Sequence, residues 1–309
     1  MEKQLIPIFF ASNDKYVPYL DVAITSLSAH TSEDHEYKIT VLKTDISEEN
    51  QNKLKMHNKE NLTVEFFDVK DILEPIKKTL PDMFYYTLAA YYRLFIEKAF
   101  PQYDKVIYLD CDIVLLEDIA KLYNIDIGDN LVAAAYEQNT DRDSRFTNYV
   151  EDIIGIPHKT YFNSGVMVMN LKKFREFGVQ DRFLNMLQTY NFDCLAPDQE
   201  YINVICHGQV KYLPTGWNKH SFPEPPEGKL NLCHYALALK PWHYENVING
   251  EYFWEYAKQS QFYDMILNEF KNYSDADKQR DQESFMNIIE GIKNIYQSDR
   301  TFKKLWFKN

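Results

Sequence analysis

The hydrophobic positions at the start of the chain alternate between two patterns, which predict strands and helices in turn. Short, almost wholly apolar runs over 5–10, 37–42 and 62–67 indicate buried strands. Between these runs, Pro18 fits the first turn of one helix and Ser47 opens another. Because strand, helix and strand alternate, we expect an α/β fold with a largely parallel sheet.

The pattern changes near residue 250. Further strands are predicted over 105–109, 131–135, 166–170, 210–213 and 230–234, and helices over 84–100, 172–190 and 198–207. Beyond residue 252 the pattern is mostly helical and contains no strand-like run. We therefore expect an α/β domain over 1–250 and a helical C-terminal extension over 251–309.

Two acids one residue apart follow the strand predicted over 105–109. Asp110 and Asp112 stand at its carboxyl end, where open α/β sheets bind ligands, and in extended chain both point to one side. Two converging carboxylates suit a hard divalent cation such as Mg²⁺ or Mn²⁺. The competing interpretation is an acidic turn, because Asp-x-Asp is common by chance. We expect Cys111, between the acids, to point into the fold and do no chemistry.

Composition and charge exclude several classes of function. The net charge of −12 disfavours generic binding to nucleic acid or to an anionic membrane. The nine glycines form neither Gly-x-Gly-x-x-Gly nor Gly-x-x-x-x-Gly-Lys, so we expect neither a dinucleotide oxidoreductase nor a P-loop phosphotransferase. A nucleotide bound here needs its phosphates neutralised by a metal and by cationic side chains.

Other features of the sequence favour a cytoplasmic protein. The apolar run at the N-terminus is too short for a secretion signal, and no segment approaches the length of a membrane helix. Four cysteines without a Cys-x-x-Cys pair are too few for a disulfide framework, which favours a reducing cytosol. The basic and aromatic segment 303–308 fits the end of a helix, and a weak peripheral contact with the inner face of a membrane is the alternative.

A second group of candidate ligands follows the strand predicted over 230–234. His234 can supply an imidazole nitrogen, which suits Mn²⁺ better than Mg²⁺, and Lys240 can meet a phosphate as a point charge. A metal and a lysine on a diphosphate are what a departing nucleoside diphosphate needs. Taken singly, the two residues also fit a strand-end histidine and a surface lysine.

Several segments, in order along the chain, resemble glycosyltransferase family 8, which includes glycogenins and bacterial lipopolysaccharide galactosyl- and glucosyltransferases. The segments are FASNDKY at 10–16, YYRL at 91–94, YLDCD at 108–112, FNSGV at 162–166, PDQE at 197–200 and HYALALKPW at 234–242. The resemblance implies a glycosyltransferase-A fold, a Rossmann-like, mixed but mainly parallel sheet flanked by helices. It also implies retaining transfer of a hexose from UDP-glucose or UDP-galactose to a glycan or glycolipid acceptor. The metal would be Mn²⁺, with Mg²⁺ as the alternative.

The same resemblance assigns roles to individual residues. Asp110, Asp112 and His234 would hold the metal on the diphosphate, which Lys240 would contact. The other donor-binding positions would be Ala11, Asn13 and Tyr16 around the uridine, Cys111 and Leu237, and Arg93, Asn163, Asp198 and Gln199 around the hexose. Glu137 lies where family members often have an acid near the sugar and the acceptor.

Gln199, Asp198 and Glu137 are the candidate catalytic residues. A retaining enzyme that works by double displacement needs a carboxylate nucleophile, and the amide of Gln199 is a poor one. We therefore expect a same-face route through an oxocarbenium-like state that the carbonyl of Gln199 stabilises. A covalent glycosyl-enzyme trapped on Asp198 or Glu137 would overturn this route.

Two positions depart from the pattern of the family. Asn13 stands where an acid is common, and Leu237 takes the glycine position of His-x-x-Gly-x-x-Lys. Glycine there lets backbone approach a phosphate closely, so Leu237 keeps open a second hypothesis, a catalytically weak sugar-nucleotide or glycan-binding protein. A nucleotidyltransferase would need a glycine- and lysine-rich phosphate loop near the N-terminus, which the sequence lacks.

Overall fold

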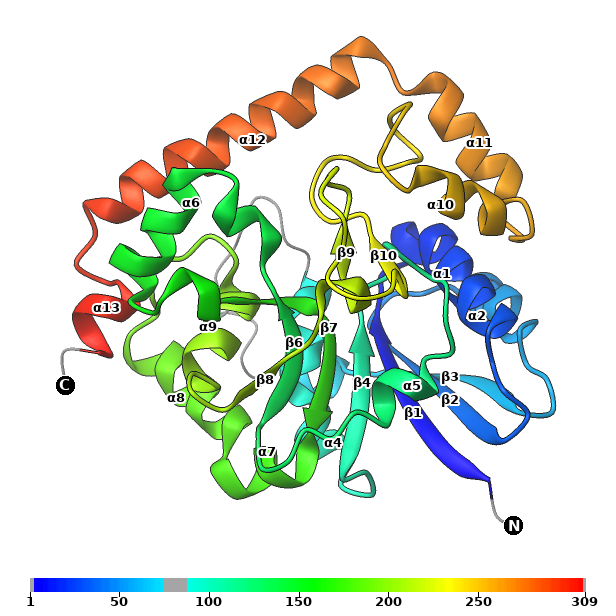
Figure 1. Ribbon diagram of the computed structural model, residues 1–309, viewed down its shortest axis with the longest axis horizontal. Helices are drawn as coiled ribbons and strands as arrows, with labels where there is room; N and C mark the ends of the chain where they lie inside the picture. The colour runs from blue at the N-terminus through cyan, green and yellow to red at the C-terminus, as the bar shows by residue number, and fades with distance from the viewer. Residues whose placement is uncertain (1–2, 75–87, 308–309) are drawn as a thin grey trace.

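A seven-stranded sheet organises the protein, whose computed structural model describes residues 3–74 and 88–307 (Figure 1). The strand order is β3-β2-β1-β4-β7-β6-β8. Neighbouring strands are parallel except that β7 runs antiparallel to both β4 and β6. The strands are β1 (Gln4–Ala11), β2 (His35–Lys43), β3 (Leu62–Asp68), β4 (Lys105–Leu109), β6 (Val132–Tyr136), β7 (Phe162–Asn170) and β8 (Val210–Tyr212). This mixed, mainly parallel sheet confirms the expected fold class.

Helices cover both faces of the sheet because its strands are apolar on both sides. In β1, Ile8 and Phe10 join the core cluster beneath α1, whereas Phe9 joins the cluster beneath α7, α8 and α9. The helices up to residue 205 are α1 (Val17–Ala29), α2 (Glu48–Lys55), α3 (Lys70–Leu73), α4 (Ile96–Ala99), α5 (Ala120–Tyr123), α6 (Ser144–Tyr149), α7 (Leu171–Phe177), α8 (Val179–Thr189) and α9 (Pro197–Ile205). The predicted starts of α1 and α2 are confirmed, since Pro18 lies in the first turn of α1 and the hydroxyl of Ser47 caps α2.

Two predicted helices differ from the observed ones. The helix expected over 84–100 is a 3₁₀ helix over Leu88–Phe95 followed by α4, and 84–87 lie outside the described residues. Within it, Nε of Arg93 donates to the carbonyl of Ala90, an acceptor that an α-helix would use for its own backbone. The helix expected over 172–190 divides into α7 and α8 at Gly178, whose φ of 71° ends α7.

Two strand predictions were also incomplete. The strand predicted over 166–170 begins earlier, because Asn163, Ser164 and Gly165 also belong to β7. Polar residues are tolerated in this buried strand because other side chains bond to them, as described below. The pattern also missed β5 (Ile113–Leu115) and β9 (Lys219–His220), which are too short to show a period.

A second, three-stranded sheet lies next to the end of β4. In it β10 (Leu232–His234) pairs antiparallel with β5 and parallel with β9. Only the turn that contains Asp110 and Asp112 separates β4 from β5, so the chain leaves the large sheet there and enters the small one. The register places His234 opposite Ile113, directly beside the two acids.

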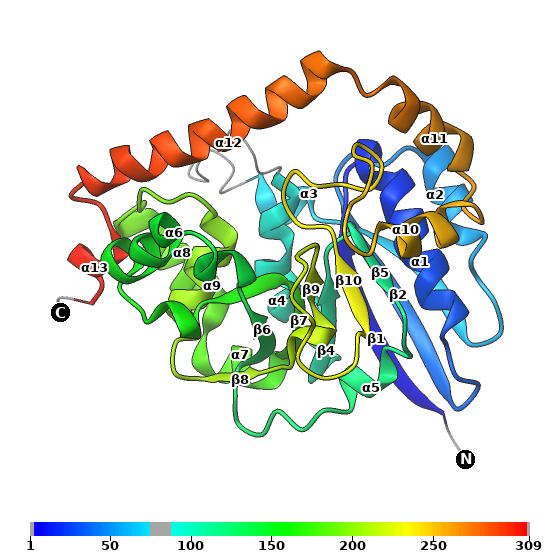
Figure 2. The ribbon, with the colours of Figure 1, turned by 45° about the horizontal axis from the view of Figure 1, so that its top comes forward.

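The helices after residue 249 contribute to both core clusters. They are α10 (Gly250–Ala257), α11 (Tyr263–Asn272), α12 (Asp275–Tyr296) and α13 (Phe302–Leu305). Phe253 and Ile266 join the cluster beneath α1, whereas Ile292 and Phe302 join the other cluster. Helix α12 crosses the molecule from α11 to α13 on the side where β1 and β4 end (Figures 1 and 2). A division of the chain at residue 250 stays a prediction.

The basic end of the chain is bound to the protein's own surface. Phe302 is fully buried, Nζ of Lys303 donates to the carbonyl of Glu151 at 2.9 Å, and Nζ of Lys304 donates to that of Ser298 at 2.7 Å. Lys308 lies outside the described residues. These contacts fit a helix end and give no support to a membrane contact. Among the described helices, none combines the length and the apolar character needed to cross a bilayer.

Candidate active site

Three candidate metal ligands meet where β4 and β10 end. Nε2 of His234 lies 3.3 Å from Oδ1 of Asp112 and 3.9 Å from Oδ2 of Asp110. One possible ligand atom of each residue lies within 4.8 Å of the other two, so the three side chains can hold a metal ion. The structure therefore brings together the residues that the sequence analysis selected from separate segments.

Gly165 of β7 leaves the space in which these ligands meet. A Cβ atom at this position would lie 2.5 Å from Oδ2 of Asp110 and 2.5 Å from Cε1 of His234. The approach of the acid and the imidazole thus requires a residue without a side chain. Two carboxylates and one imidazole are donors that Mn²⁺ accepts readily and Mg²⁺ accepts less well. The residues present fit a divalent cation.

Lys240 is buried beside the candidate metal site. Its ammonium group forms an ion pair with Oδ2 of Asp112 and donates to the carbonyl of Tyr235 at 2.6 Å. Burial would raise the pKa of Asp112, but Lys240 and His234 outweigh it and hold that pKa well below its ordinary value. Asp112 is therefore a carboxylate at neutral pH, ready to bind a cation.

Arg93 joins the metal side of the site to the side expected to bind the sugar. Its Nη2 donates to Oδ1 of Asp110 at 2.9 Å, and its Nε lies 3.3 Å from Oδ2 of Asp198. The same guanidinium donates to the carbonyl and the hydroxyl of Ser164 and lies 4.3 Å from the ring centre of Tyr108. With only 5% of its surface exposed, Arg93 neutralises two carboxylates inside the protein.

Asp198 and Gln199 begin α9 and face the same region. Burial raises the pKa of Asp198 to about 6, although Arg93 opposes the rise. Oδ1 of Asp198 is buried without a hydrogen-bond partner among the described residues. Oε1 of Gln199 accepts from the backbone N–H of Ser164 at 3.0 Å, which fixes the orientation of the amide. An unpaired acceptor next to a fixed amide suits a ligand that carries hydroxyl groups.

Glu137 and Asn163 are bonded mainly to protein groups. Oε1 of Glu137 accepts from the backbone and side chain of Asn139, and Oε2 accepts from Nδ2 of Asn163 at 2.7 Å. Burial would raise the pKa of Glu137, but His220 and these hydrogen bonds lower it. Oδ1 of Asn163 accepts from the N–H of Gly165 and from Nδ2 of Asn218. Both side chains thus belong to an internal network.

The residues expected around the uridine lie at the end of β1. Ala11 ends the strand, and its carbonyl accepts from Sγ of Cys111, whose side chain is buried in the core. Oδ1 of Asn13 accepts from the N–H of Tyr16 and caps the following 3₁₀ turn. Burial raises the pKa of Tyr16, and the carboxylate of Asp112 raises it further. The uridine-binding roles stay predictions.

Leu237 adopts a backbone conformation that favours glycine. Its φ is 61°, in the left-handed region, and 49% of its surface is exposed. A branched side chain in this region costs roughly 1 kcal/mol that glycine does not incur. Residue 237, at which the resemblance to family 8 implies glycine, therefore has a backbone conformation that favours glycine although the residue is leucine.

We expect Leu237→Gly to raise the free energy of unfolding by up to about 1 kcal/mol, because it removes this backbone strain. Urea denaturation at neutral pH measures the change. Leu237→Ala is the matched control, since it removes the exposed side chain but keeps the strained φ, and we expect no gain from it. Equal stabilisation by both variants would show that the exposed side chain, rather than the backbone, is the cause.

Sequence reasoning missed two buried residues of the site, Asn218 and His220. Oδ1 of Asn218 lies 2.8 Å from Nδ1 of His234, and the ring of His220 meets that of His234 edge to face. Neither ring nitrogen of His220 has a hydrogen-bond partner in the described part of the chain, and burial lowers its pKa to about 4. Both residues lie in the segment around β9, which carries no pattern that a single sequence reveals.

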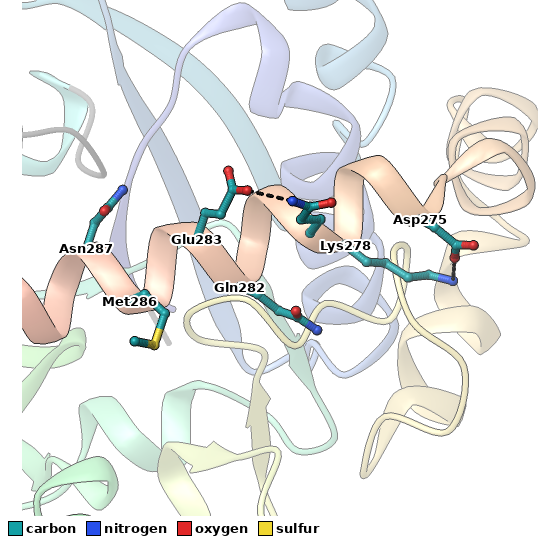
Figure 3. A pocket seen from close by; sticks show the side chains of 7 residues that line it. Asp275, Lys278, Gln282, Glu283, Met286 and Asn287 are labelled. Atoms are coloured by element: carbon teal, nitrogen blue, oxygen red, sulfur yellow. Dashed lines mark hydrogen bonds and ion pairs between the residues drawn. The ribbon is translucent and has the colours of Figure 1, made fainter.

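An open hollow of different character follows one face of α12 (Figure 3). It is lined by Asp275, Lys278, Gln279, Gln282, Glu283, Met286 and Asn287. Lys278 bonds to Asp275, and Gln279 bonds to Glu283, along the same helix. None of the predicted site residues lines this hollow, so it is separate from the candidate active site.

The sheet and the site together define a class of protein. A Rossmann-like sheet without a glycine-rich phosphate loop carries two carboxylates after β4, and the adjoining small sheet and the segment after it place an imidazole and a buried lysine beside them. This arrangement is suited to a glycosyltransferase. Residues 7–246 match the model of the family described as Glycosyl transferase family 8. The chain belongs to this family.

Relatives and solved structures agree with this assignment. A Haemophilus influenzae protein provisionally named a glycosyltransferase is 30% identical over 251 residues, which are 78% of this chain and 74% of that protein. A lipopolysaccharide 1,2-glucosyltransferase of Escherichia coli K12 is 28% identical over 180 residues, 53% of this chain and 52% of that enzyme. The crystal structure of galactosyltransferase LgtC with donor and acceptor sugar analogues superposes with a TM-score of 0.69 at 25% identity, over 83% of this chain and 96% of LgtC.

Proposed function

We propose that this protein transfers glucose or galactose from a UDP-sugar to a carbohydrate acceptor, with retention at the anomeric carbon and metal-assisted departure of UDP. The observation that carries the proposal is the convergence of Asp110, Asp112 and His234, with Lys240 beside them, in a chain of family 8. A nucleoside diphosphate leaves with developing negative charge, and this cluster is the cationic environment that stabilises it once a metal is bound.

The donor would lie along the carboxyl ends of β1 and β4 and the beginning of β7, which share one edge of the sheet. Asp110, Asp112 and His234 would hold Mn²⁺, with Mg²⁺ as the weaker alternative, and Lys240 would exchange its bond to Asp112 for the diphosphate. The metal, when bound, neutralises the diphosphate and polarises the bond to the sugar. The uridine would contact Ala11, Asn13 and Tyr16, close to Cys111 and Leu237.

Asp198, Gln199 and Arg93 would surround the hexose. The unpaired Oδ1 of Asp198 can accept from a sugar hydroxyl, and Arg93 holds this carboxylate in place. Because Oε1 of Gln199 already accepts from Ser164, the amide is preorganised. Oε1 also accepts from the hydroxyl of Ser164 at 3.3 Å, and this longer bond would give way when the oxygen stabilises an oxocarbenium-like centre. A same-face route remains our proposal, and a glycosyl adduct trapped on Asp198 or Glu137 would contradict it.

We further propose a glycan or glycolipid acceptor and a cytoplasmic location. Similarity to a lipopolysaccharide glucosyltransferase supports an acceptor of this kind. All four cysteines are buried free thiols, as expected for a reducing compartment.

A catalytically weak sugar-nucleotide or glycan-binding protein is the second candidate, and strained Leu237 is the observation that favours it. The test is release of UDP from UDP-glucose, UDP-galactose and UDP-xylose with Mn²⁺, compared with calorimetric binding of each donor. We expect turnover with one of the two hexose donors and little with the pentose donor. Binding without release of UDP would favour the second candidate, and neither binding nor release would contradict both.

A further inference from the structure

A continuous row of buried hydrogen bonds runs from Glu137 to His234 beneath the candidate metal site. Nδ2 of Asn163 donates to Oε2 of Glu137 at 2.7 Å, Nδ2 of Asn218 donates to Oδ1 of Asn163 at 2.9 Å, and Nδ1 of His234 lies 2.8 Å from Oδ1 of Asn218. At most 7% of the surface of any of these four residues is exposed. A broken link would therefore leave a buried polar group unpaired, which is costly.

The direction of every bond in the row follows from two groups whose roles are fixed, the carboxylate of Glu137 and the backbone N–H of Gly165. Oδ1 of Asn163 also faces the backbone N–H of Gly165, which can only donate, so this atom must be an acceptor. The NH₂ group of Asn163 then faces Glu137, and a carboxylate can only accept. Asn218 must consequently donate to Asn163 with its own NH₂ group, and its carbonyl oxygen faces the imidazole of His234.

The row thus decides which nitrogen of the imidazole carries the proton. A carbonyl oxygen at Nδ1 requires a proton on Nδ1, so neutral His234 presents the lone pair of Nε2. Nε2 is the atom that faces Asp110 and Asp112. We propose that Glu137 is a positioning residue, which acts through Asn163 and Asn218 to hold His234 in the tautomer and orientation that bind the metal.

This inference rests on the proposed function because it assumes that a metal binds at His234. It also gives Glu137 a role other than nucleophile or general acid, since Oε1 is occupied by Asn139 and Oε2 by Asn163. Loss of such an indirect partner of a metal ligand typically weakens metal affinity 10- to 100-fold.

The first test measures Mn²⁺ affinity without any sugar nucleotide, by electron paramagnetic resonance of the free ion. We expect Asn218→Ala to weaken Mn²⁺ binding about 10- to 100-fold, and Glu137→Gln to weaken it less, because glutamine still offers Asn163 an acceptor. Asn203→Ala is the matched control. Asn203 of α9 is as buried as Asn218, and it bonds to the backbone of Phe162, which precedes Asn163 in β7. It lies outside the row of hydrogen bonds. We expect its Mn²⁺ affinity to stay within about threefold of the wild type.

The second test reads the tautomer directly in the metal-free wild-type protein, so it does not depend on how well a variant folds. Long-range ¹H–¹⁵N spectra distinguish the two tautomers, and the spectrum of His234→Gln identifies the signals of His234 among the eight histidines. We expect neutral His234 with its proton on Nδ1. A proton on Nε2, unchanged Mn²⁺ affinity in Asn218→Ala, or a wild-type protein that binds no Mn²⁺ would each overturn the proposal. Absence of UDP release from every donor, with the tautomer and affinity results as expected, would instead contradict the proposed function alone.

Discussion

Replacing Asp112 with asparagine is expected to lower the rate of UDP release from the donor at least about 1,000-fold, equivalent to about 4 kcal/mol of transition-state stabilisation. Asparagine keeps the size of the side chain but removes the charge that binds a cation. It also leaves the buried ammonium of Lys240 without its carboxylate partner. Steady-state release of UDP with saturating Mn²⁺ measures the effect.

Asp104→Asn is the matched control for this prediction. Asp104 immediately precedes β4, so it lies at the other end of the strand that Asp112 follows, and it forms an exposed ion pair with Arg175. We expect its rate to stay within about twofold of the wild type, because exposed ion pairs contribute little. Thermal unfolding of both variants shows whether Asp112→Asn is folded when it is assayed. A folded Asp112→Asn protein with more than a tenth of the wild-type rate would show that the catalytic metal is not held by this residue.

Replacing Arg93 with leucine is expected to lower the free energy of unfolding by about 3–5 kcal/mol. The variant leaves two carboxylates, those of Asp110 and Asp198, without the cation between them. It also removes the donors to Ser164, whose carbonyl and hydroxyl then lose a partner inside the protein. Urea denaturation at pH 8 measures the loss, and a change below 1 kcal/mol would contradict the assigned role of Arg93.

The pH dependence of the Arg93→Leu variant gives an independent check. Burial already raises the pKa of Asp198 from 3.8 to about 6, and loss of Arg93 raises it further. A carboxyl group whose pKa is higher in the folded state destabilises the fold as pH rises from its unfolded pKa through its folded pKa. The variant should therefore lose more stability at pH 8 than at pH 5, and a second change, Asp198→Asn, should restore part of the loss at pH 8. Arg145→Leu, which removes an exposed pair with Asp143, should leave the free energy of unfolding close to that of the wild type at both pH values.

The large elements and the position of the paired acids could be predicted because each carries a local signal, whereas the other site residues were selected by the resemblance to family 8. Apolar strands reveal themselves by composition, so β1 to β4 were located closely, and Asp110 and Asp112 stand out as charges at the end of one of them. Tertiary contacts accompany one wrong prediction, the α-helix expected over 84–100. Arg93 lies in a segment whose residues favour an α-helix, yet its bonds to Ala90, Ser164 and Asp110 accompany a 3₁₀ winding.

The supporting residues of the site could not be predicted because their meaning depends on partners far away in the sequence. Asn218 is an ordinary polar residue until the fold places it between Asn163 and His234. Asn163 was selected as a hexose-binding residue by the resemblance to family 8, but its bonds to Glu137 and Asn218 inside a buried strand are visible only in the structure. Leu237 is the reverse case. The sequence marks it as a departure from the family pattern, and its φ of 61° explains why glycine is favoured at this position.

The arrangement of Asp110 and His234 depends on the glycine at position 165. Alanine, the smallest substitution available, already places an atom 2.5 Å from both an acid and the imidazole, so a library randomised at this position has a single residue compatible with the present arrangement. Any other residue at this position requires the side chains of Asp110 and His234 to move away from it. Glycine at position 165 therefore accompanies the close approach of Asp110 and His234 in this chain.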